Sequence, residues 1–207
     1  MYKSIGIIPA AGQAQRFGGI VKELLPVKDG LSLLRHAYIR LQKVCDLIIC
    51  VTNKDKVHIH MKELREVLFV EQNNTADILG AIQSGMKIQA ERYYFTMPDT
   101  YIDDDVFSNT PVNDGLSVGI FETCKPERFG CLSNGFIHDK SKDVQSPAQA
   151  WGALSWGDNH RGFFFNNATL PDALNSIISK SGFQAWWIGD YHDMATIHDY
   201  IEYLKNG

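Results

Sequence analysis

The sequence predicts an α/β fold in which a mostly parallel sheet is flanked by helices on both faces. Short apolar runs of strand length alternate four times with helix-type patterns in the first hundred residues. Parallel strands need crossover connections, and helices usually supply them. At 207 residues the chain is long enough to bury one such core. No internal repeat or linker interrupts it, so we expect a single domain over residues 1–207.

The first half supplies the alternation. Continuous apolar runs are typical of strands buried on both faces. Apolar residues spaced i, i+3, i+4 are typical of amphipathic helices. We therefore expect strands at residues 5–9, 46–52, 68–71 and 93–97, and helices at 31–44, 56–67 and 76–90.

The second half has a different pattern, which predicts a β-rich part joined to the sheet. Pro171 suits the first turn of a helix, because that position needs no N–H donor. Turns are expected at Asn134-Gly135 and at residues 157–159. The expected strands are residues 116–122, 129–138, 151–156 and 162–165, and the expected helices are 171–180 and 195–205.

Composition excludes several classes of function. A net charge of -4 argues against a nucleic-acid-binding surface. No apolar stretch approaches the roughly 20 residues needed to span a bilayer. The N-terminus lacks the parts of a signal peptide, and four cysteines without a CxxC pair suggest reduced, mostly buried thiols. We therefore expect a cytoplasmic protein. The seven histidines lack the spacing of a zinc site.

The first strand opens into a run of small residues that suits an anion. Backbone N–H groups can approach a phosphate closely where side chains are small. Arg16 and Lys22 then supply positive charge for a polyphosphate. The segment has neither the GKS/GKT of a P-loop nor the GxGxxG of a dinucleotide fold. It reads Ala10-Ala11-Gly12-Gln13-Ala14-Gln15-Arg16-Phe17-Gly18-Gly19, and Lys22-Glu23-Leu24-Leu25-Pro26-Val27 follows.

This segment resembles the signature of the sugar-1-phosphate nucleotidyltransferases, A-x-G-x-G-T-R followed by K-x-L-L-P. Gly12, Arg16 and Lys22 match, whereas Ala14 and Gln15 replace the family's second glycine and its threonine. The resemblance implies that Arg16 and the loop amides hold the β- and γ-phosphates and that Lys22 contacts the α-phosphate. By the same resemblance, the nucleotide-binding residues of this segment are Ala10, Ala11 and Gly12.

Further matches follow in the family's order. Gln72 and Asp77 stand where related enzymes place a base-reading glutamine and the turn into the next helix. Pro98 and Asp99 end an apolar strand, like the family's G-D, whose aspartate binds Mg²⁺. An acidic residue at that end of a strand also faces the crevice where α/β sheets bind ligands. The stretch Trp187-Ile188-Gly189-Asp190-Tyr191-His192-Asp193-Met194-Ala195-Thr196 resembles W-x-D-x-G-T, which implies that Asp193, rather than its neighbour Asp190, is the second metal ligand.

The substrate side matches less completely. Lys125-Pro126-Glu127-Arg128-Phe129-Gly130 is similar to D-P-E-R-Y-G, which implies that Gly130 meets the sugar. Residues 151–156 are similar to T-G-L-Y-F-Y, which implies a substrate contact at Gly152. The family's E-K-P, whose lysine holds the sugar phosphate, is replaced by Gln145-Ser146-Pro147. The candidates for that missing charge are Lys125, Lys140 and Lys142.

The resemblance implies a nucleotide-diphospho-sugar transferase fold, Rossmann-like with a β-rich sugar-binding part. It also implies Mg²⁺-dependent transfer of an NMP from an NTP to a sugar-1-phosphate, with release of pyrophosphate. Three alternatives stay open: a cytidylyltransferase for a polyol or choline phosphate, a non-catalytic nucleotide- or sugar-binding relative, and an α/β domain with accidental matches. The first shares A-A-G-x-x-x-R-F-G. The sequence leaves the base, the acceptor and the oligomeric state open.

Overall fold

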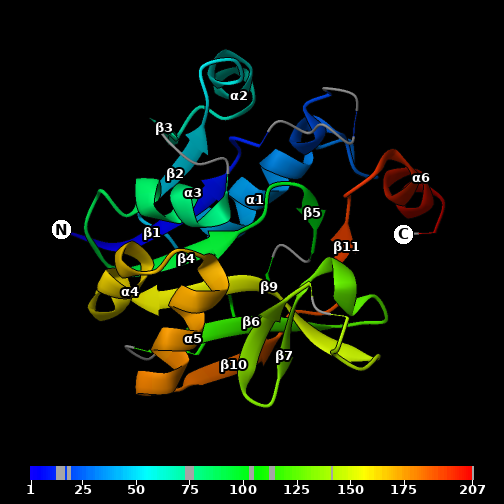
Figure 1. Cartoon of the computed structure of the whole chain (residues 1–207). Coiled ribbons are helices and arrows are strands. Elements are labelled where there is room, and N and C mark those ends of the chain that lie inside the picture. Colours follow the sequence, from blue (N-terminus) through cyan, green and yellow to red (C-terminus); the bar gives the residue numbers. More distant parts are fainter. Residues whose placement is uncertain are drawn as a thin grey trace.

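The computed structural model describes residues 1–12, 17, 20–72, 77–102, 105–111, 115–140 and 142–206 (Figure 1). Within these residues, nine strands form one sheet with the order β10-β6-β9-β4-β1-β2-β3, and β7 and β8 extend it from β9. Neighbours pair in parallel except at β9, which runs antiparallel to β4, β6 and β7, and at the β7–β8 pair. The strands are β1 (Tyr2–Pro9), β2 (Leu47–Thr52), β3 (Leu68–Glu71), β4 (Ala90–Thr96), β6 (Leu116–Thr123), β7 (Gly130–Ser133), β8 (Phe136–Asp139), β9 (Ala148–Gly157) and β10 (Phe183–Trp187).

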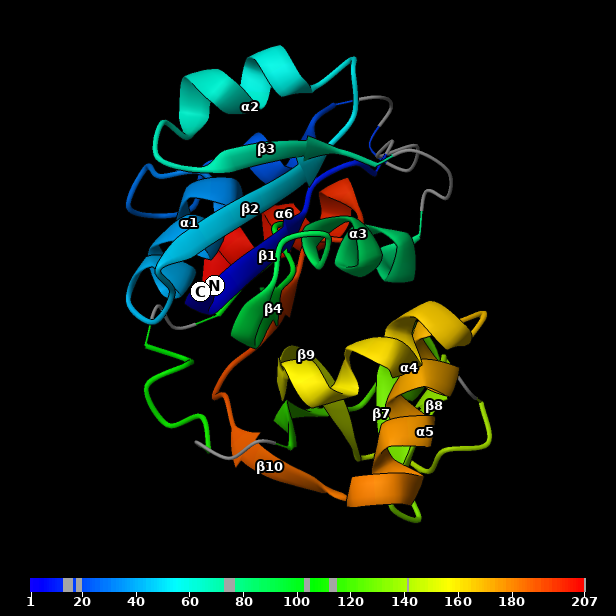
Figure 2. The ribbon, with the colours of Figure 1, turned by 90° about the vertical axis from the view of Figure 1, so that its left-hand side faces the viewer.

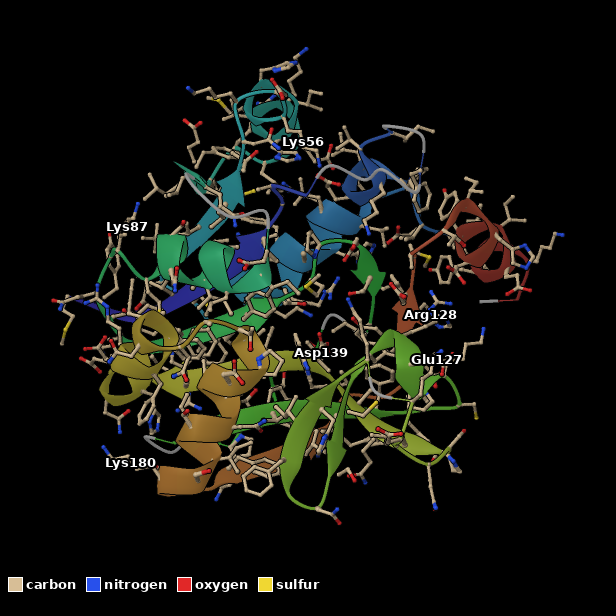
Figure 3. All side chains as sticks on the ribbon, in the orientation of Figure 1. Lys56, Lys87, Glu127, Arg128, Asp139 and Lys180 are labelled. Carbon is tan, nitrogen blue, oxygen red and sulfur yellow. The ribbon has the colours of Figure 1, made fainter. Side chains whose placement is uncertain are left out.

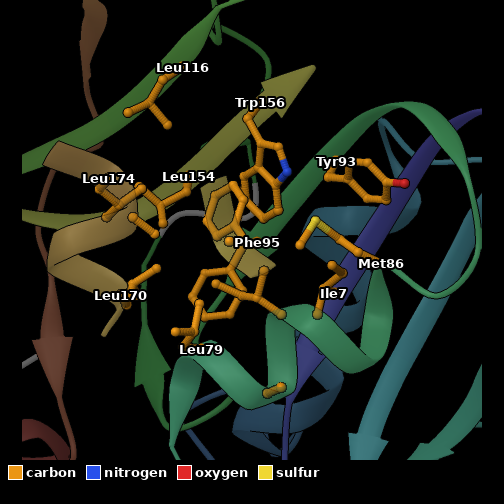
Figure 4. Close-up of a cluster of buried hydrophobic side chains, with 14 of the residues drawn as sticks. Ile7, Leu79, Met86, Tyr93, Phe95, Leu116, Leu154, Trp156, Leu170 and Leu174 are labelled. Atoms are coloured by element: carbon orange, nitrogen blue, oxygen red, sulfur yellow. The ribbon is translucent and has the colours of Figure 1, made fainter. Parts of the chain in front are cut away.

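Helices cover both faces of this sheet, as the alternation predicted (Figure 2). Side chains of α1 (Leu33–Gln42) join the buried cluster on one face. On the other face the core includes side chains from α3 (Ile78–Gly85), α4 (Arg161–Asn166) and α5 (Leu170–Ser181). Figure 4 shows part of this second core, to which Leu79 of α3, Phe95 of β4 and Trp156 of β9 all contribute buried side chains. The predicted α/β class with a mostly parallel sheet is confirmed.

Side-chain caps explain where the three longer of these helices begin. The hydroxyl of Ser32 accepts from the N–H of Arg35 at the start of α1. The Asp77 carboxylate accepts from the N–H of Gly80 at the start of α3. Thr169 caps α5, which carries the expected proline in its first turn. Such caps satisfy backbone donors that have no partner inside the helix.

Two further helices lie at the periphery of the sheet. α2 (Val57–Glu63) follows β2 and ends earlier than the expected limit at residue 67, because Leu64 is extended. α6 (Ile197–Asn206) ends the described chain. Its Tyr200 and Tyr203 pack in a third cluster with Phe17, Val27, Leu33 and Met194.

The expectation of a strand at residues 162–165 is wrong, because these residues belong to α4. A short apolar run does not distinguish a strand from a buried helical turn by its period. Here Phe164 is fully buried against Trp156, with ring centroids 4.7 Å apart, while Phe165 is exposed. The expected turn at residues 157–159 is likewise a short 3-10 helix at Asp158–His160. The turn at Asn134-Gly135 is confirmed between β7 and β8.

Two expectations drawn from composition can be compared with the structure: that the cysteines are reduced and mostly buried, and that no apolar stretch spans a bilayer. All four cysteines are free, and Cys50 and Cys131 are buried as expected, but Cys124 is exposed and Cys45 only partly buried. Among the described residues, no helix combines the length and apolarity needed to cross a membrane.

Candidate active site

A cavity of about 610 Å³ opens beside the carboxyl end of β4, where a ligand-binding crevice is expected in an α/β sheet. Its walls come from segments far apart in the chain, including the starts of α3 and α5, the β7–β8 hairpin and β9. Asp139 and Arg128, both labelled in Figure 3, line the cavity from the β7–β8 hairpin and the segment before it. Of the predicted site residues, the cavity is lined by Lys22, Asp77, Asp99, Gly130 and Asp193.

The two predicted metal aspartates are brought together by a small second sheet. β5 (Thr100–Tyr101) pairs antiparallel with β11 (His192–Asp193), so that Thr100 lies opposite Asp193. The N–H of Met194 also donates to the carbonyl of Asp99, at 3.2 Å. Burial raises the pKa of Asp193, and the charge of Asp99 raises it further, while Arg128 and Lys22 oppose the shift. A buried carboxylate whose proton affinity is raised by a neighbouring carboxylate favours a bound cation.

Lys22 contacts one member of this carboxylate pair. It begins the 3-10 helix η2 (Lys22–Leu24), and its ammonium forms an ion pair with Oδ2 of Asp99. The other oxygen of Asp99, Oδ1, is buried and has no hydrogen-bond partner among the described residues. A buried carboxylate oxygen without a partner is costly, so this position suits an added ligand.

These residues fit a Mg²⁺ ion. Mg²⁺ in enzymes that act on phosphates is usually held by one or two carboxylates, with substrate oxygens and water completing an octahedron. Asp99 Oδ1 and the Asp193 carboxylate supply such a pair. No cluster of three or more His, Cys, Asp or Glu ligands occurs in the described part of the chain.

Arg128 holds the second aspartate in place. Its Nη2 donates to Asp193 at 2.7 Å, and its guanidinium makes a two-pronged contact with Asp199 at 2.9 and 3.0 Å. Asp199 also accepts from the N–H and hydroxyl of Thr196 at the start of α6. These bonds lower the pKa of Asp199 to about 2 and raise the pKa of Arg128. Sequence reasoning alone gives Arg128 no role, and the signal that points to it is its place in the Pro126-Glu127-Arg128-Phe129-Gly130 string.

The predicted nucleotide-binding loop is described only at its start. Ala10 and Ala11 are buried, and the Ala10 N–H donates to the Val51 carbonyl at 2.7 Å. Asn53 Nδ2 donates to the carbonyl of Ala11 at 2.7 Å, which fixes the exit of β1. Gly12 is exposed. Arg16, with Ala14 and Gln15, lies outside the described residues, so its catalytic role stays a prediction.

The other predicted nucleotide-binding residues have structural contacts of their own. Gln72 Nε2 donates to the carbonyl of Asp77 at 2.9 Å, and Asp77 caps α3 from the cavity wall. Pro98 is buried in the turn that precedes Asp99. Gln72 and Pro98 do not line the cavity. Their contacts with a nucleotide stay predictions.

The two predicted substrate glycines make room for aromatic walls. A Cβ on Gly130 would lie 2.2 Å from Nε1 of Trp151, and both residues line the cavity. A Cβ on Gly152 would lie 2.5 Å from the ring of Tyr191, which stacks on Phe121 with centroids 4.0 Å apart. Gly152 does not line the cavity itself but leaves room for Tyr191, which does, so its contact with a substrate stays a prediction.

One lysine of the three proposed substitutes reaches the cavity. Lys140 lines it, beside Asp139 and Glu127. Lys125 instead lines a neighbouring hollow of about 380 Å³, which shares Arg128 with the cavity, and Lys142 lines neither. Ser146 at the E-K-P position donates its hydroxyl to the carbonyl of Cys124.

A buried polar network lies under Lys22, and nothing in the sequence drew attention to it. Glu23 is 3% exposed and accepts from Lys56 Nζ at 2.7 Å and from His60 Nε2 at 3.1 Å. The other ring nitrogen of His60 is 2.8 Å from the Thr52 hydroxyl. Burial opposes ionisation of Glu23, yet these two partners lower its pKa. The network therefore ties η2 to β2 and α2.

The fold and the enzyme class now follow from comparison with known proteins. The family model of the MobA-like NTP transferase domain matches residues 6–108, and this part of the chain belongs to that family. The chain is thus an enzyme of the nucleotidyltransferase class, and the resemblance to the sugar-1-phosphate nucleotidyltransferases is confirmed. A search of curated protein sequences finds no significant match.

Solved structures share the whole fold at low sequence identity. One is a protein from Bacillus anthracis provisionally assigned as a glucose-1-phosphate thymidylyltransferase, in complex with sucrose (TM-score 0.83, 20% identity, 98% of this chain and 94% of that one). A UDP-glucose pyrophosphorylase complexed with UDP-glucose has a TM-score of 0.78 at 19% identity, over 99% and 98% of the two chains. The inositol-1-phosphate CTP transferase of T. maritima has a TM-score of 0.75 at 14% identity, over 98% and 95%.

Proposed function

We propose that this nucleotidyltransferase joins the NMP of an NTP to a sugar-1-phosphate and releases pyrophosphate, with Mg²⁺ as cofactor. The observation that carries the proposal is the convergence of Asp99, Asp193 and Lys22 on one cavity beside the end of β4. Two carboxylates for a cation and one ammonium suit a reaction between two phosphates. The neighbours described as pyrophosphorylases support the substrate class.

The reaction needs positioning and charge neutralisation more than covalent chemistry. An oxygen of the acceptor phosphate attacks the α-phosphorus of the NTP. The bond from that phosphorus to the bridging oxygen breaks, and the electron pair leaves with pyrophosphate. No group of the protein needs to form a covalent bond. The protein must hold two anions in line and keep them from repelling each other.

Lys22 has the central role in this scheme. In the structure its ammonium contacts Asp99, on the cavity wall. With an NTP bound, Lys22 turns to the α-phosphate and offsets the charge that develops there. Mg²⁺ held by Asp99 and Asp193 would neutralise phosphate oxygens and orient them for the attack. Arg128 keeps Asp193 in position throughout, because its bonds to Asp199 anchor it to α6.

Lys140 is our candidate for the phosphate of the acceptor, since it is the one of the three proposed lysines that lines the cavity. The exchange of E-K-P for Gln145-Ser146-Pro147 favours a second candidate, a cytidylyltransferase for a polyol phosphate. A neighbour described as an inositol-1-phosphate CTP transferase supports this alternative.

The test is pyrophosphate release with Mg²⁺, over the four common NTPs with dTTP added, against sugar-1-phosphates and polyol phosphates. Release with one sugar pair supports the first proposal, and release with CTP and a polyol phosphate supports the second. Asp99→Asn should abolish the release, and the exposed Asp190→Asn is the matched control that should not. Nucleotide binding without release from any pair would contradict both candidates.

A further inference from the structure

A fully buried arginine lies behind the carboxylate pair. Arg40 belongs to α1, on the side of the sheet away from α3, and its exposed fraction is 0%. Placing a guanidinium in the interior is costly unless its donors are satisfied in good geometry. An apolar residue at this helical position would pack without that cost. The presence of a charged guanidinium at this buried position therefore needs a structural explanation.

The Arg40 side chain bonds to both sides of one turn. Its Nη1 donates to the Thr96 hydroxyl at 3.0 Å, and its Nη2 donates to the Thr100 carbonyl at 3.1 Å. Its Nε donates to the carbonyl of His36 at 3.1 Å, one turn earlier in α1. The planar guanidinium is thus fixed to the helix and holds two points of a neighbouring segment. A lysine could not reproduce this fork.

The segment between these two points carries Asp99. Thr96 is the last residue of β4, and Thr100 is the first residue of β5. The Thr100 hydroxyl donates to the carbonyl of Met97 at 3.3 Å, which closes the turn. Thr100 also lies opposite Asp193 in the pairing of β5 with β11. The positions of both aspartates therefore depend on the segment that Arg40 holds.

We propose that Arg40 is a positioning residue that sets the geometry of the Asp99–Asp193 pair from behind the site, through Thr96 and Thr100. The inference rests on the proposed function only in taking this pair as the cation site. Arg40 does not line the cavity, so its influence passes through the turn. Residues that orient metal ligands in this way often matter about 10–100-fold for metal affinity or activity.

The experiment measures binding of Mn²⁺ alone by electron paramagnetic resonance, which requires no turnover. Arg40→Met should weaken Mn²⁺ binding about tenfold or more. Thr96→Val removes a single acceptor and should weaken it about threefold, whereas Thr96→Ser keeps the hydroxyl and should restore binding. Arg35→Met is the matched control on the same helix, because Arg35 lies over the Tyr38 ring and not at the turn. Asp99→Asn is the reference for loss of the site.

The outcomes separate this inference from the function. Wild-type Mn²⁺ binding in Thr96→Val and in folded Arg40→Met, with binding lost in Asp99→Asn, would overturn the role of Arg40 alone. Unchanged binding in Asp99→Asn would overturn the cation site and this inference with it. If Arg40→Met does not fold, the Thr96→Val and Thr96→Ser pair decides. In variants that fold, we also expect a fall in kcat that exceeds the change in KM for the acceptor, which a general loss of stability would not produce.

Discussion

Lys22 forms an ion pair with Asp99, its proposed fellow site residue. Both side chains are largely buried, at 21% and 13% exposure, so the pair is poorly screened by water. The contact occupies one oxygen of Asp99 and leaves the other without a partner among the described residues. A cation and Lys22 therefore compete for the same carboxylate until a phosphate draws the lysine away.

This competition predicts opposite effects of one substitution. Lys22→Met should strengthen binding of Mn²⁺ alone, because Asp99 loses its internal cation. The same variant should lose about 100-fold or more in kcat, because the charge on the α-phosphate is no longer offset. Paramagnetic resonance and pyrophosphate release measure the two effects. The exposed Lys28→Met is the control, and weaker Mn²⁺ binding in Lys22→Met would contradict the competition.

Acid should destabilise the protein through Asp199. Its pKa is lowered to about 2 in the folded protein, first of all by the bonds from Arg128, from an ordinary value of 3.8. A carboxylate with a depressed folded pKa adds stability above its unfolded pKa and loses it as the pH falls through the folded value. At pH 6 the free energy of unfolding of the wild-type protein, measured in urea, should therefore exceed that of Asp199→Asn. The difference between the two proteins should shrink between about pH 4 and pH 2. A difference independent of pH would contradict the assignment.

Gly152 and Gly162 should respond in opposite directions to the same added methyl group. Gly152→Ala puts a Cβ 2.5 Å from the Tyr191 ring, so we expect a loss of about 1–3 kcal/mol in the free energy of unfolding. Gly162 lies in α4, and an added Cβ would meet its nearest neighbour, the side chain of Asn166 in the same helix, only at 3.9 Å, so Gly162→Ala should add about 0.5–1 kcal/mol. Urea unfolding gives both values. Destabilisation by Gly162→Ala would argue against the helix.

The free energy of unfolding should depend on both hydrogen-bond partners of Glu23, which are Lys56 and His60. Lys56→Met leaves the carboxylate of Glu23 buried beside His60 alone, and we expect a loss of about 3–5 kcal/mol in the free energy of unfolding. The double variant Lys56→Met with Glu23→Leu should recover part of that loss, because no buried charge is then left. Lys54→Met, whose side chain is 83% exposed, is the control. A double variant no more stable than the single one would contradict this account.

The sequence alone determined the elements whose signals are local. The strands at residues 5–9 and 68–71 and the helix over 31–44 follow from apolar spacing, and the structure contains each of them within a few residues. β10 was not predicted, because its buried and exposed residues follow no clear alternation. The run at residues 162–165 was misassigned because its partner, Trp156, lies in another element.

The same distinction between local signals and tertiary structure applies to the candidate site. Motif resemblance, which depends on residue types along the chain, was enough to nominate Lys22, Asp99 and Asp193. Only the tertiary structure decided that Lys22 contacts Asp99, that Arg128 supports Asp193 and that Arg40 holds the turn between β4 and β5. These contacts join residues far apart in the chain. They depend on the pairing of β5 with β11 and the packing of α1 on the sheet, and no local pattern in the sequence encodes such distances.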